Sequence, residues 1–367
     1  MWRILNNSTQ LTGHRGTVGS VAISSSGDCA VSGAYRDYGS EHEIRVWDLS
    51  NEKQSQEIRT GLNGIFSLAF SPDCQHVLVG GGGTVDQGCW QYTSGVEVWR
   101  LDGSGMETRF GRELYFVKSI AFSHDRDFLV TSNLRTPNGQ GANDETCVTV
   151  WRTSDFSKVA AFGRHEVGIG SACFSPDGQR VVFASNQGGG PAPLQANSSL
   201  SRRLLSKFHL KRNVEVALHD LNSMAPLIRV WNVGERIEEP ALQLSKGRIE
   251  RVAFSPSGRL LSSAGSELRI YDFRTRALIK QLDYLPNTYS NCVAFSPDET
   301  VLASGGGFQD EPGSPYQDCG VKLWDVKSGS VVAFLPHRKP VHSLAFSPDG
   351  RKLVAGGELG DLLMWNL

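Results

Sequence analysis

Short runs in which apolar and polar residues alternate recur along the whole chain, a pattern typical of β-strands with one buried face. The C-terminal segment shows the order of these runs most clearly. An entrance loop at His337–Pro340 precedes apolar runs at Val341–Phe346, Lys352–Ala355 and Leu362–Trp365, and a Ser-Pro-Asp-Gly turn follows the first run. This turn is favourable because proline fixes φ, aspartate bonds its own backbone and glycine accepts positive φ. A less regular fourth, outer strand is predicted at Gln56–Arg59, Lys158–Phe162, Ala241–Leu244, Leu278–Leu282 and Val331–Leu335.

The same two-part unit is repeated seven times. Its first part, an apolar run that leads into the tight turn, stands at Val21–Ser24, Leu68–Asp73, Ile120–Asp125, Ala172–Gly178, Val252–Gly258, Val293–Asp298 and Leu344–Gly350. Its second part is an alternating run closed by an aromatic residue at Trp47, Trp99, Trp151, Trp231, Tyr271, Trp324 and Trp365. A regular period of roughly 40–50 residues predicts a repeat architecture in which each unit forms one small sheet.

The spacing of the two parts shows where the repeats differ in length. We use as a marker the residue before the turn, which is Ile23 in the first repeat and Phe in the others. The step from each closing aromatic to the next marker is nearly constant along the chain. The step from a marker to its own closing aromatic varies widely, from the short step between Phe254 and Tyr271 to the long one between Phe174 and Trp231. The length variation therefore falls in the connection between the second and third strands, which in a radial array lies on one face.

Three of these connections are candidates for recognition loops: Gly80–Gly95, Ser132–Thr146 and Gly305–Gly320. The first contains Trp90 and Tyr92. Loops carry binding residues disproportionately, and aromatic residues are enriched among interface anchors. We therefore expect Trp90 and Tyr92 to contribute to partner binding. The alternative is that these loops are solvated and have no role.

The two ends of the chain complement one another. Only Asn366 and Leu367 follow the last Trp, whereas a much longer segment precedes Ile23. The step from Trp365 around to Ile23, counted through both ends of the chain, nearly equals the regular step from a closing aromatic to the next marker. We expect an N-terminal strand to complete the last sheet and close the ring.

These repeats resemble the WD-repeat β-propeller family along essentially the whole chain. Gly13 and His14 match the family's Gly-His element, and the seven closing aromatics match its Trp-Asp endings. His occupies the Gly-His position only in repeats one, four and seven, at His14, His165 and His337. The resemblance implies an all-β fold, a seven-bladed propeller of four-stranded antiparallel blades closed by an N-terminal strand. It also implies a non-catalytic scaffold that binds proteins or peptides.

The family's buried His–Ser/Thr–Asp–Trp relay is most nearly complete in repeat one. There His14, Ser32 and Trp47 match it, while Glu41 stands at the usual Asp position. Repeat six keeps Ser304, Asp318 and Trp324. Most repeats are therefore expected to depend on apolar packing rather than on the relay.

Composition narrows the class of partner and the compartment. The net charge is −1, so no global field favours nucleic acid or an anionic membrane. The seven Cys include no CxxC pair, which favours a reducing, cytoplasmic setting. The N-terminal residues lack the pattern of a secretory signal, and no apolar stretch is long enough to span a membrane. The chain is interpreted as one propeller over residues 1–367, with no cofactor and no metal.

Counting back six and four residues from each marker gives positions at the entrance of the inner strand. Seven of these positions carry aromatic or charged residues, which we expect to surround the central opening and bind the partner: Phe66, Phe116, Lys118, Arg248, Glu250, Tyr289 and His342. The alternative is that they are ordinary strand-entrance residues.

Repeat four holds the largest insertion, residues 186–226. It contains a basic stretch with Arg202, Arg203 and Lys207, and its apolar residues at Leu200, Leu204 and Phe208 permit a short helix. We consider a docking element for an acidic partner, a solvated arm, and a weak nucleic-acid footprint. The partner-binding set therefore includes these three basic residues, although nucleic acid is unlikely.

Motifs of catalysis are few. Glu41, His42 and Glu43 are residue types that can ligate a metal. They are adjacent in the sequence, however, and neighbouring residues on a strand point to opposite faces, which disfavours a shared site. Gly80–Gly83 lacks the Lys-Ser/Thr of a phosphate loop. Two alternatives to the scaffold remain: a propeller hydrolase or lyase whose ligands are scattered over several blades, and a sensor module of a larger multidomain assembly. The sequence does not predict an oligomeric state.

Overall fold

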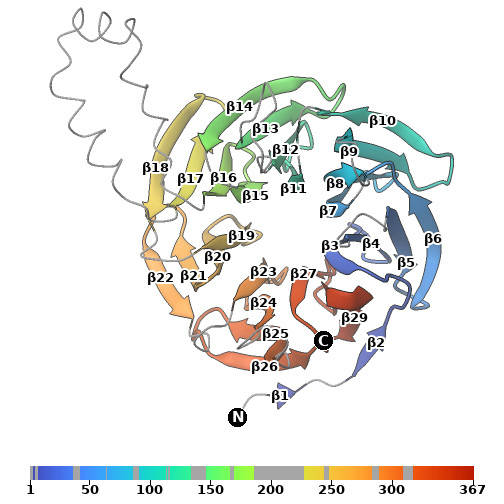
Figure 1. Ribbon diagram of the computed structural model, residues 1–367. Coiled ribbons are helices and arrows are strands. Elements are labelled where there is room, and N and C mark those ends of the chain that lie inside the picture. Colours follow the sequence, from blue (N-terminus) through green and yellow to red (C-terminus); the bar gives the residue numbers. More distant parts are fainter. Residues whose placement is uncertain are drawn as a thin grey trace, which may run out of the picture.

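The computed structural model describes residues 3–4, 7–35, 42–62, 64–85, 91–112, 114, 116–133, 146–165, 169–185, 227–243, 248–282, 289–308 and 317–367. Seven antiparallel sheets stand around a central axis as blades, as the sequence predicts (Figure 1). Each blade runs outward from an inner strand that begins at the entrance face of the ring and ends in the tight turn on the opposite face.

The strands of blades one to four are β3 (Thr17–Ile23), β4 (Cys29–Tyr35), β5 (Glu43–Asp48) and β6 (Lys53–Arg59); β7 (Ile65–Phe70), β8 (His76–Val85), β9 (Gln91–Arg100) and β10 (Met106–Phe110); β11 (Val117–Phe122), β12 (Phe128–Asn133), β13 (Thr146–Arg152) and β14 (Lys158–His165); β15 (Ile169–Phe174), β16 (Arg180–Ser185), β17 (Leu227–Asn232) and β18 (Ile237–Gln243). Those of blades five to seven are β19 (Ile249–Phe254), β20 (Leu260–Gly265), β21 (Leu268–Asp272) and β22 (Leu278–Leu282); β23 (Ser290–Phe295), β24 (Val301–Phe308), β25 (Gln317–Asp325) and β26 (Val331–Pro336); β27 (Val341–Phe346), β28 (Lys352–Gly357), β29 (Leu362–Asn366) and the N-terminal β2 (Ser8–Gln10). A short 3₁₀ turn, η1 (Glu358–Gly360), joins β28 to β29.

The N-terminus closes the ring, which confirms the prediction from the spacing. Strand β2 pairs antiparallel with β29, with Ser8 opposite Trp365. Leu11, only 1% exposed, continues this seam by donating its N–H to the Leu362 carbonyl at 2.9 Å. One feature was not predicted: β1 (Arg3–Ile4) adds a fifth, parallel strand to the outer edge of β26 in blade six.

The core consists of apolar clusters between neighbouring blades. Trp47 of blade one packs in a cluster with Val354 and Met364 of blade seven. Trp365 of blade seven packs with Leu323 and Leu335 of blade six. Each of these closing aromatics therefore packs against the side of the preceding blade that faces it. The apolar surface buried there stabilises the contact between neighbouring sheets.

The seven tight turns share one hydrogen bond, in which the serine hydroxyl before the turn accepts the N–H of the residue that begins the second strand. In blade four the Ser175 hydroxyl donates to the Asp177 carboxylate and accepts the Arg180 N–H at 3.0 Å. Positive φ is required near the end of the turn, and Gly178 supplies it in this blade. Blades two, three and six instead place Cys74, Arg126 and Glu299 there, with φ of 55°, 71° and 61°.

Hydrogen bonds to the closing Trp vary from blade to blade. In blade one, Ser32 lies between His14 Nε2 and Trp47 Nε1, at 2.7 Å from each, as the resemblance implies. Burial, and secondarily the nearby Arg45 guanidinium, lowers the pKa of His14 to about 3, so the imidazole is neutral. Glu41 lies outside the described residues.

Ionic contacts supplement apolar packing more often than expected. Five blades carry a charged residue two positions before the closing aromatic, and each of these residues has an ion-pair partner. The pairs are Arg45–Glu57, Glu97–Arg109, Arg229–Glu238, Arg269–Glu267 and Lys322–Asp318.

Two of the predicted loops are shorter than the sequence indicated. The long hairpin of blade two keeps strand pairing out to Val85 and Gln91, so most of Gly80–Gly95 is strand. In blade six, Phe308 pairs with Gln317, which leaves only residues 309–316 between the strands. Glycine-rich sequence suggested a loop in both places, but backbone pairing between the two arms continues through it.

Candidate functional site

The entrance ends of the seven inner strands meet around one opening on the ring axis. The fourth residue before each marker lines this opening in every blade: Gly19, Phe66, Lys118, Gly170, Glu250, Asn291 and His342. Arg248, Arg251, Tyr35 and Ile169 complete the wall. The cavity volume is about 110 Å³. This arrangement follows from the fold, because equivalent positions of a radial repeat face the same axis.

One side of the opening is aromatic. The rings of Tyr35 and Phe66 lie 5.0 Å apart, and Phe116 contacts Phe66 edge-on at 5.8 Å. A side chain at Gly19 would collide with Tyr35, since its Cβ would lie 2.6 Å from that ring. The Lys118 ammonium lies over the Phe66 ring, 4.8 Å from the centroid. Lys118 therefore joins the aromatic side to the charged side by a cation–π contact.

The other side is charged. Arg248 and Glu250 form an ion pair with Nε and Oε1 2.6 Å apart. His342 Nε2 lies 3.7 Å from the Glu358 carboxylate. Arg251, half-buried in the wall, faces the same space. Desolvation lowers the pKa of both Lys118 and Arg251, and the Arg251 charge lowers that of Lys118 further.

Arg251 interrupts a regular structural motif. The position three residues before the marker is serine in five blades, and each serine bonds to the backbone of the next inner strand. Ser20, Ser119, Ser171 and Ser343 accept N–H groups from Leu68, Ala172, Val252 and Val21 at 2.9 to 3.0 Å, and Ser67 donates to the Val117 carbonyl at 3.2 Å. Cys292 and Arg251 stand at this position in blades six and five.

The comparisons with known proteins agree with this repeat geometry. The sequence profile of the family described as "WD domain, G-beta repeat" matches residues 6–48, 54–85, 286–325 and 329–366. The chain is a seven-bladed β-propeller, and these four segments are similar to WD repeats. Its matched segments include both ends of the chain and so span the closure between blades seven and one.

Similar curated proteins belong to multisubunit assemblies by name. "Target of rapamycin complex subunit wat1" of Schizosaccharomyces pombe is 26% identical over 38% of this chain and 42% of its own length. "Target of rapamycin complex subunit LST8" of Mus musculus is 27% identical over 38% of this chain and 41% of its own length. "Guanine nucleotide-binding protein subunit beta" of Oryza sativa subsp. indica is 23% identical over 97% of this chain and 82% of its own length. The chain spans less than half the length of the first of these relatives.

The propeller brings five of the seven count-back residues into the wall of the opening: Phe66, Lys118, Arg248, Glu250 and His342. Phe116 contacts Phe66 edge-on but does not line the opening, and neither does Tyr289, which is 51% exposed. Trp90, Arg202, Arg203, Lys207 and the insertion 186–226 fall outside the described residues, and Tyr92 is described only by its backbone in β9. Sequence reasoning missed Tyr35 and Arg251. For Arg251 the break in the serine pattern was the available signal.

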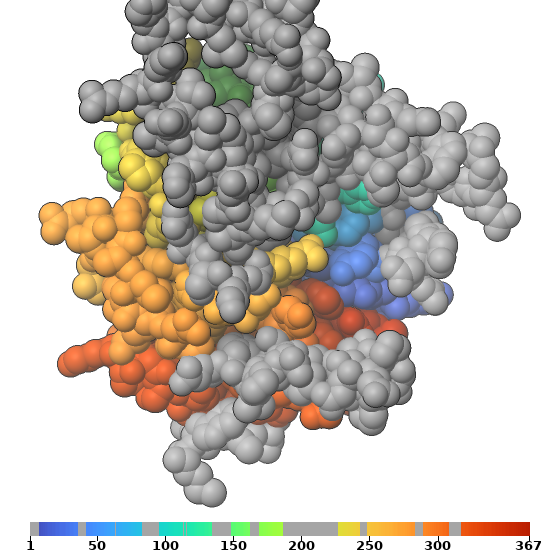
Figure 2. Space-filling view, turned by 60° about the vertical axis from the view of Figure 1, so that its left-hand side comes forward, coloured from blue at the N-terminus to red at the C-terminus, as the bar shows by residue number. Residues whose placement is uncertain are grey.

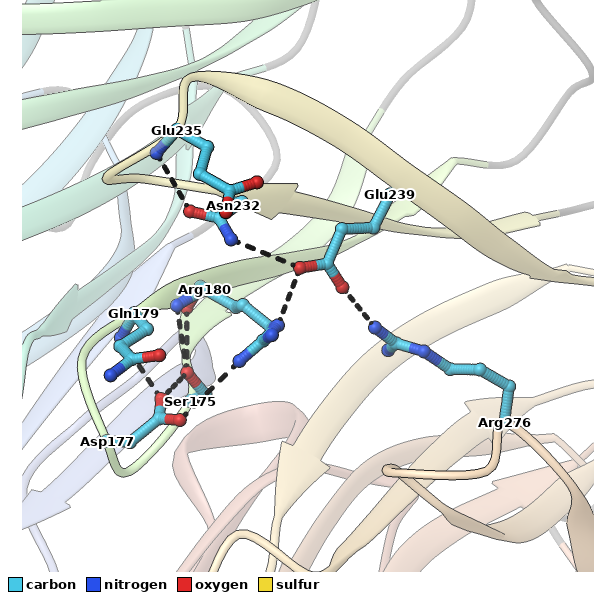
Figure 3. Close-up of polar contacts among 8 residues, drawn as sticks. All are labelled: Ser175, Asp177, Gln179, Arg180, Asn232, Glu235, Glu239 and Arg276. Atoms are coloured by element: carbon cyan, nitrogen blue, oxygen red, sulfur yellow. Dashed lines mark hydrogen bonds and ion pairs between the residues drawn. The ribbon is translucent and has the colours of Figure 1, made fainter.

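The opposite face of the propeller has a larger cleft, about 500 Å³, between blades four and five. In it Glu239 accepts hydrogen bonds from Arg180 Nε at 2.8 Å and from Arg276 at 2.5 Å (Figure 3). The Arg276 guanidinium also lies 4.1 Å from the centre of the Phe273 ring. Both arginines thus have a carboxylate partner already, so the network joins two blades rather than presenting free charge to a ligand.

The outer side of the ring at blades five and six comes forward in Figure 2. There the outer strand β22 exposes Leu278 and Ile279, each 47% exposed. No helix in the described part of the chain is long and apolar enough to cross a membrane. Across the same residues, no group of three or more His, Cys, Asp and Glu side chains is arranged to hold a metal ion.

Proposed function

We propose that this propeller is a non-catalytic platform for a protein or peptide partner, and that the partner docks on the entrance face around the central opening. The names of the relatives support a role in assemblies, because two are complex subunits and one is a subunit of a guanine nucleotide-binding protein. Fold alone does not determine function, so the proposal rests on the surface around the opening.

The observation that carries the proposal is the convergence of all seven inner-strand entrances on one cavity with aromatic and charged walls. A rim of this kind supplies the two components of an interface hot spot, a rigid aromatic anchor and charged groups that select the partner. Phe66 is the central anchor because its ring contacts Tyr35, Phe116 and Lys118.

The size of the cavity limits what can enter it. Pockets for small molecules usually measure about 300–1,000 Å³. The opening, at about 110 Å³, accommodates one side chain. We therefore propose that a peptide lies across the entrance face and inserts a single residue, while the loops around the rim contact the rest of it.

The cysteine side chains bear on the cellular compartment of the protein. Five cysteines of the described residues are free thiols, namely Cys29, Cys74, Cys173, Cys292 and Cys319. Burial raises the pKa of Cys173 and Cys292 to about 12, which keeps both thiols protonated and unreactive. We propose a reducing, cytoplasmic compartment on this basis.

A display library of random twelve-residue peptides tests the docking face. Peptides selected on the wild-type protein should bind the Phe66→Ala variant about 30-fold more weakly, which corresponds to the loss of roughly 2 kcal/mol at an interface anchor. Arg248→Ala should weaken binding as well. Ile279→Ala on β22 is the matched control, an exposed apolar residue on the outer side of the ring.

The binding measurements discriminate between two surfaces. Affinity that is unchanged in Phe66→Ala and Arg248→Ala but lost in Ile279→Ala would place the docking surface on the outer edge of the ring and refute the proposal. Circular dichroism and thermal unfolding of each variant show whether the ring has remained folded.

A further inference from the structure

The opening carries positive charge that has no partner in the described residues. Arg248 is neutralised by Glu250. Lys118 and Arg251 also line the cavity, yet within the described ranges no carboxylate lies in ion-pair distance of either. Glu250 is ion-paired with Arg248, and its charge also acts on both cations by raising the pKa of each, but one carboxylate is shared among three cationic side chains. Two cations therefore face one small, partly desolvated space.

The two cations are held in place by the fold rather than by each other. Lys118 is the fourth residue before the marker in blade three and is fixed over the Phe66 ring. Arg251 lies on β19 of blade five, in the position where five other blades place a short serine that links neighbouring inner strands. An arginine there forgoes that hydrogen bond and brings a charge into a half-buried wall, which is unfavourable unless an anion compensates it.

We infer that the central opening is an anion subsite, in which Lys118 and Arg251 together bind one carboxylate side chain of the docked peptide. The inference rests on the proposed function, since it specifies which residue of the peptide enters the opening. A carboxylate suits the site because a guanidinium binds both of its oxygens through paired N–H donors, while an ammonium adds a third contact.

The rest of the wall is consistent with an aspartate or glutamate side chain. The cavity of about 110 Å³ has room for a carboxylate and its methylene groups. Tyr35 and Phe66 supply apolar contact for the methylenes on the aromatic side. The low local dielectric strengthens the attraction between the carboxylate and both cations relative to water.

Two matched peptide libraries test this assignment. Each consists of fluorescein-labelled peptides with five random neutral residues on either side of a fixed central residue, which is Glu in one library and Gln in the other. The wild-type protein should bind the Glu library about tenfold or more tightly than the Gln library, because hydrogen bonds to charged groups are stronger than neutral ones. A third library with phosphoserine at the centre separates a carboxylate site from a phosphate site.

Three variants assign the preference to residues. Arg251→Ser restores the residue found in five other blades and is therefore expected to fold, and it should reduce the Glu-over-Gln preference to about threefold or less. Lys118→Met should have a similar effect while keeping an unbranched side chain near Phe66. Arg351→Ser is the matched control, since Arg351 follows the tight turn of blade seven and its side chain is 84% exposed.

Each outcome either supports the inference or overturns it. A Glu preference that falls in Arg251→Ser and Lys118→Met but not in Arg351→Ser supports it. Equal binding of the Glu and Gln libraries, with both lost in Phe66→Ala, overturns the anion subsite and leaves the proposed function standing. Tighter binding of the phosphoserine library than of the Glu library overturns the carboxylate assignment. Failure of every library to bind overturns both proposals.

Discussion

Replacement of Glu97 by alanine is expected to destabilise the propeller by about 3–5 kcal/mol, the usual cost of removing one member of a buried ion pair. Glu97 lies on β9, two residues before Trp99, and its side chain is fully buried. Its carboxylate accepts hydrogen bonds from the Arg109 guanidinium, from Trp99 Nε1 at 2.7 Å and from the Gly61 N–H at 3.1 Å. Gly61 belongs to the connection between blades one and two, so one carboxylate joins two blades.

The magnitude follows from the groups that the substitution would leave behind. Arg109 is 22% exposed, so water would partly solvate its charge. The two neutral donors, from Trp99 and Gly61, would each lose a partner at a cost of about 1–3 kcal/mol if they stayed dry. These costs are not additive, because the neighbourhood can relax and admit water. Changing both Glu97 and Arg109 to Met should recover part of the loss, since the unpaired charge is then absent.

The assay is equilibrium urea unfolding followed by circular dichroism, and the same hairpin supplies the control. Glu107 on β10 pairs with Arg100 at 3.0 Å and with His76 at 2.8 Å, but all three side chains are partly exposed. Glu107→Ala should therefore cost at most about 1 kcal/mol. A loss for Glu97→Ala no larger than that for Glu107→Ala would refute the reasoning from burial.

Three further predictions concern the closure, the relay and the turns. Deletion of residues 1–12 should lower the melting temperature strongly, because it removes β2 and the buried Leu11 from blade seven. His14 has its pKa lowered to about 3 in the folded state, against about 6.5 in the unfolded chain, so stability should be complete above pH 6.5 and fall as the pH decreases, by at most about 1.4 kcal/mol per pH unit. Arg126→Gly should stabilise the protein by about 0.5–1 kcal/mol, because φ of 71° strains a residue with a side chain.

Each of these has an internal control. Deletion of residues 1–6 alone removes only the peripheral β1 and should have a small effect, and an equal effect of both deletions would contradict the closure argument. His14→Gln should flatten the pH dependence between pH 6.5 and 5, and an unchanged slope would exclude His14 as its source. Glu299→Gly relieves the same strain as Arg126→Gly but loses the hydrogen bond between the Glu299 carboxylate and the Ser257 hydroxyl, at 2.9 Å. Glu299→Gly should therefore not stabilise the protein. If both substitutions stabilise it, the backbone conformation of the turn outweighs the lost side-chain hydrogen bond.

The fold could be predicted from the sequence because its signals are local and repeated. The alternating runs, the tight turns and the regular spacing fix the blades. The step from Trp365 around to Ile23, which nearly equals the regular step, predicts the closure by β2. The parallel addition of β1 to β26 could not be predicted, since Arg3 and Ile4 carry no pattern that would select an outer edge. The glycine-rich arms of blade two were predicted as a loop because backbone pairing leaves no signal in side-chain composition.

The site was predictable in part for the same reason. Counting from the marker finds the ring of positions that face the axis, because a repeat places equivalent residues at equivalent depths. It does not show which side chains contact across the opening. Tyr35 enters the site from the end of β4, and only the absence of a side chain at Gly19 gives it room. Such contacts depend on the relative placement of neighbouring strands, which spacing along the chain does not specify.

Under the proposed function, adjacent residues of the same inner strand serve stability and recognition. The residue three before the marker joins neighbouring blades through serine hydroxyls, and the residue four before it lines the opening and varies freely, from Gly19 to Phe66 to Glu250. Variation at the position four residues before the marker costs little folding free energy, because its side chain projects into the opening rather than into the apolar clusters between blades. Arg251 departs from this division, since a charged side chain occupies the position that elsewhere holds the ring together. For that reason we propose that Arg251, rather than the more exposed Arg248, determines which side chain of the partner the opening would accept.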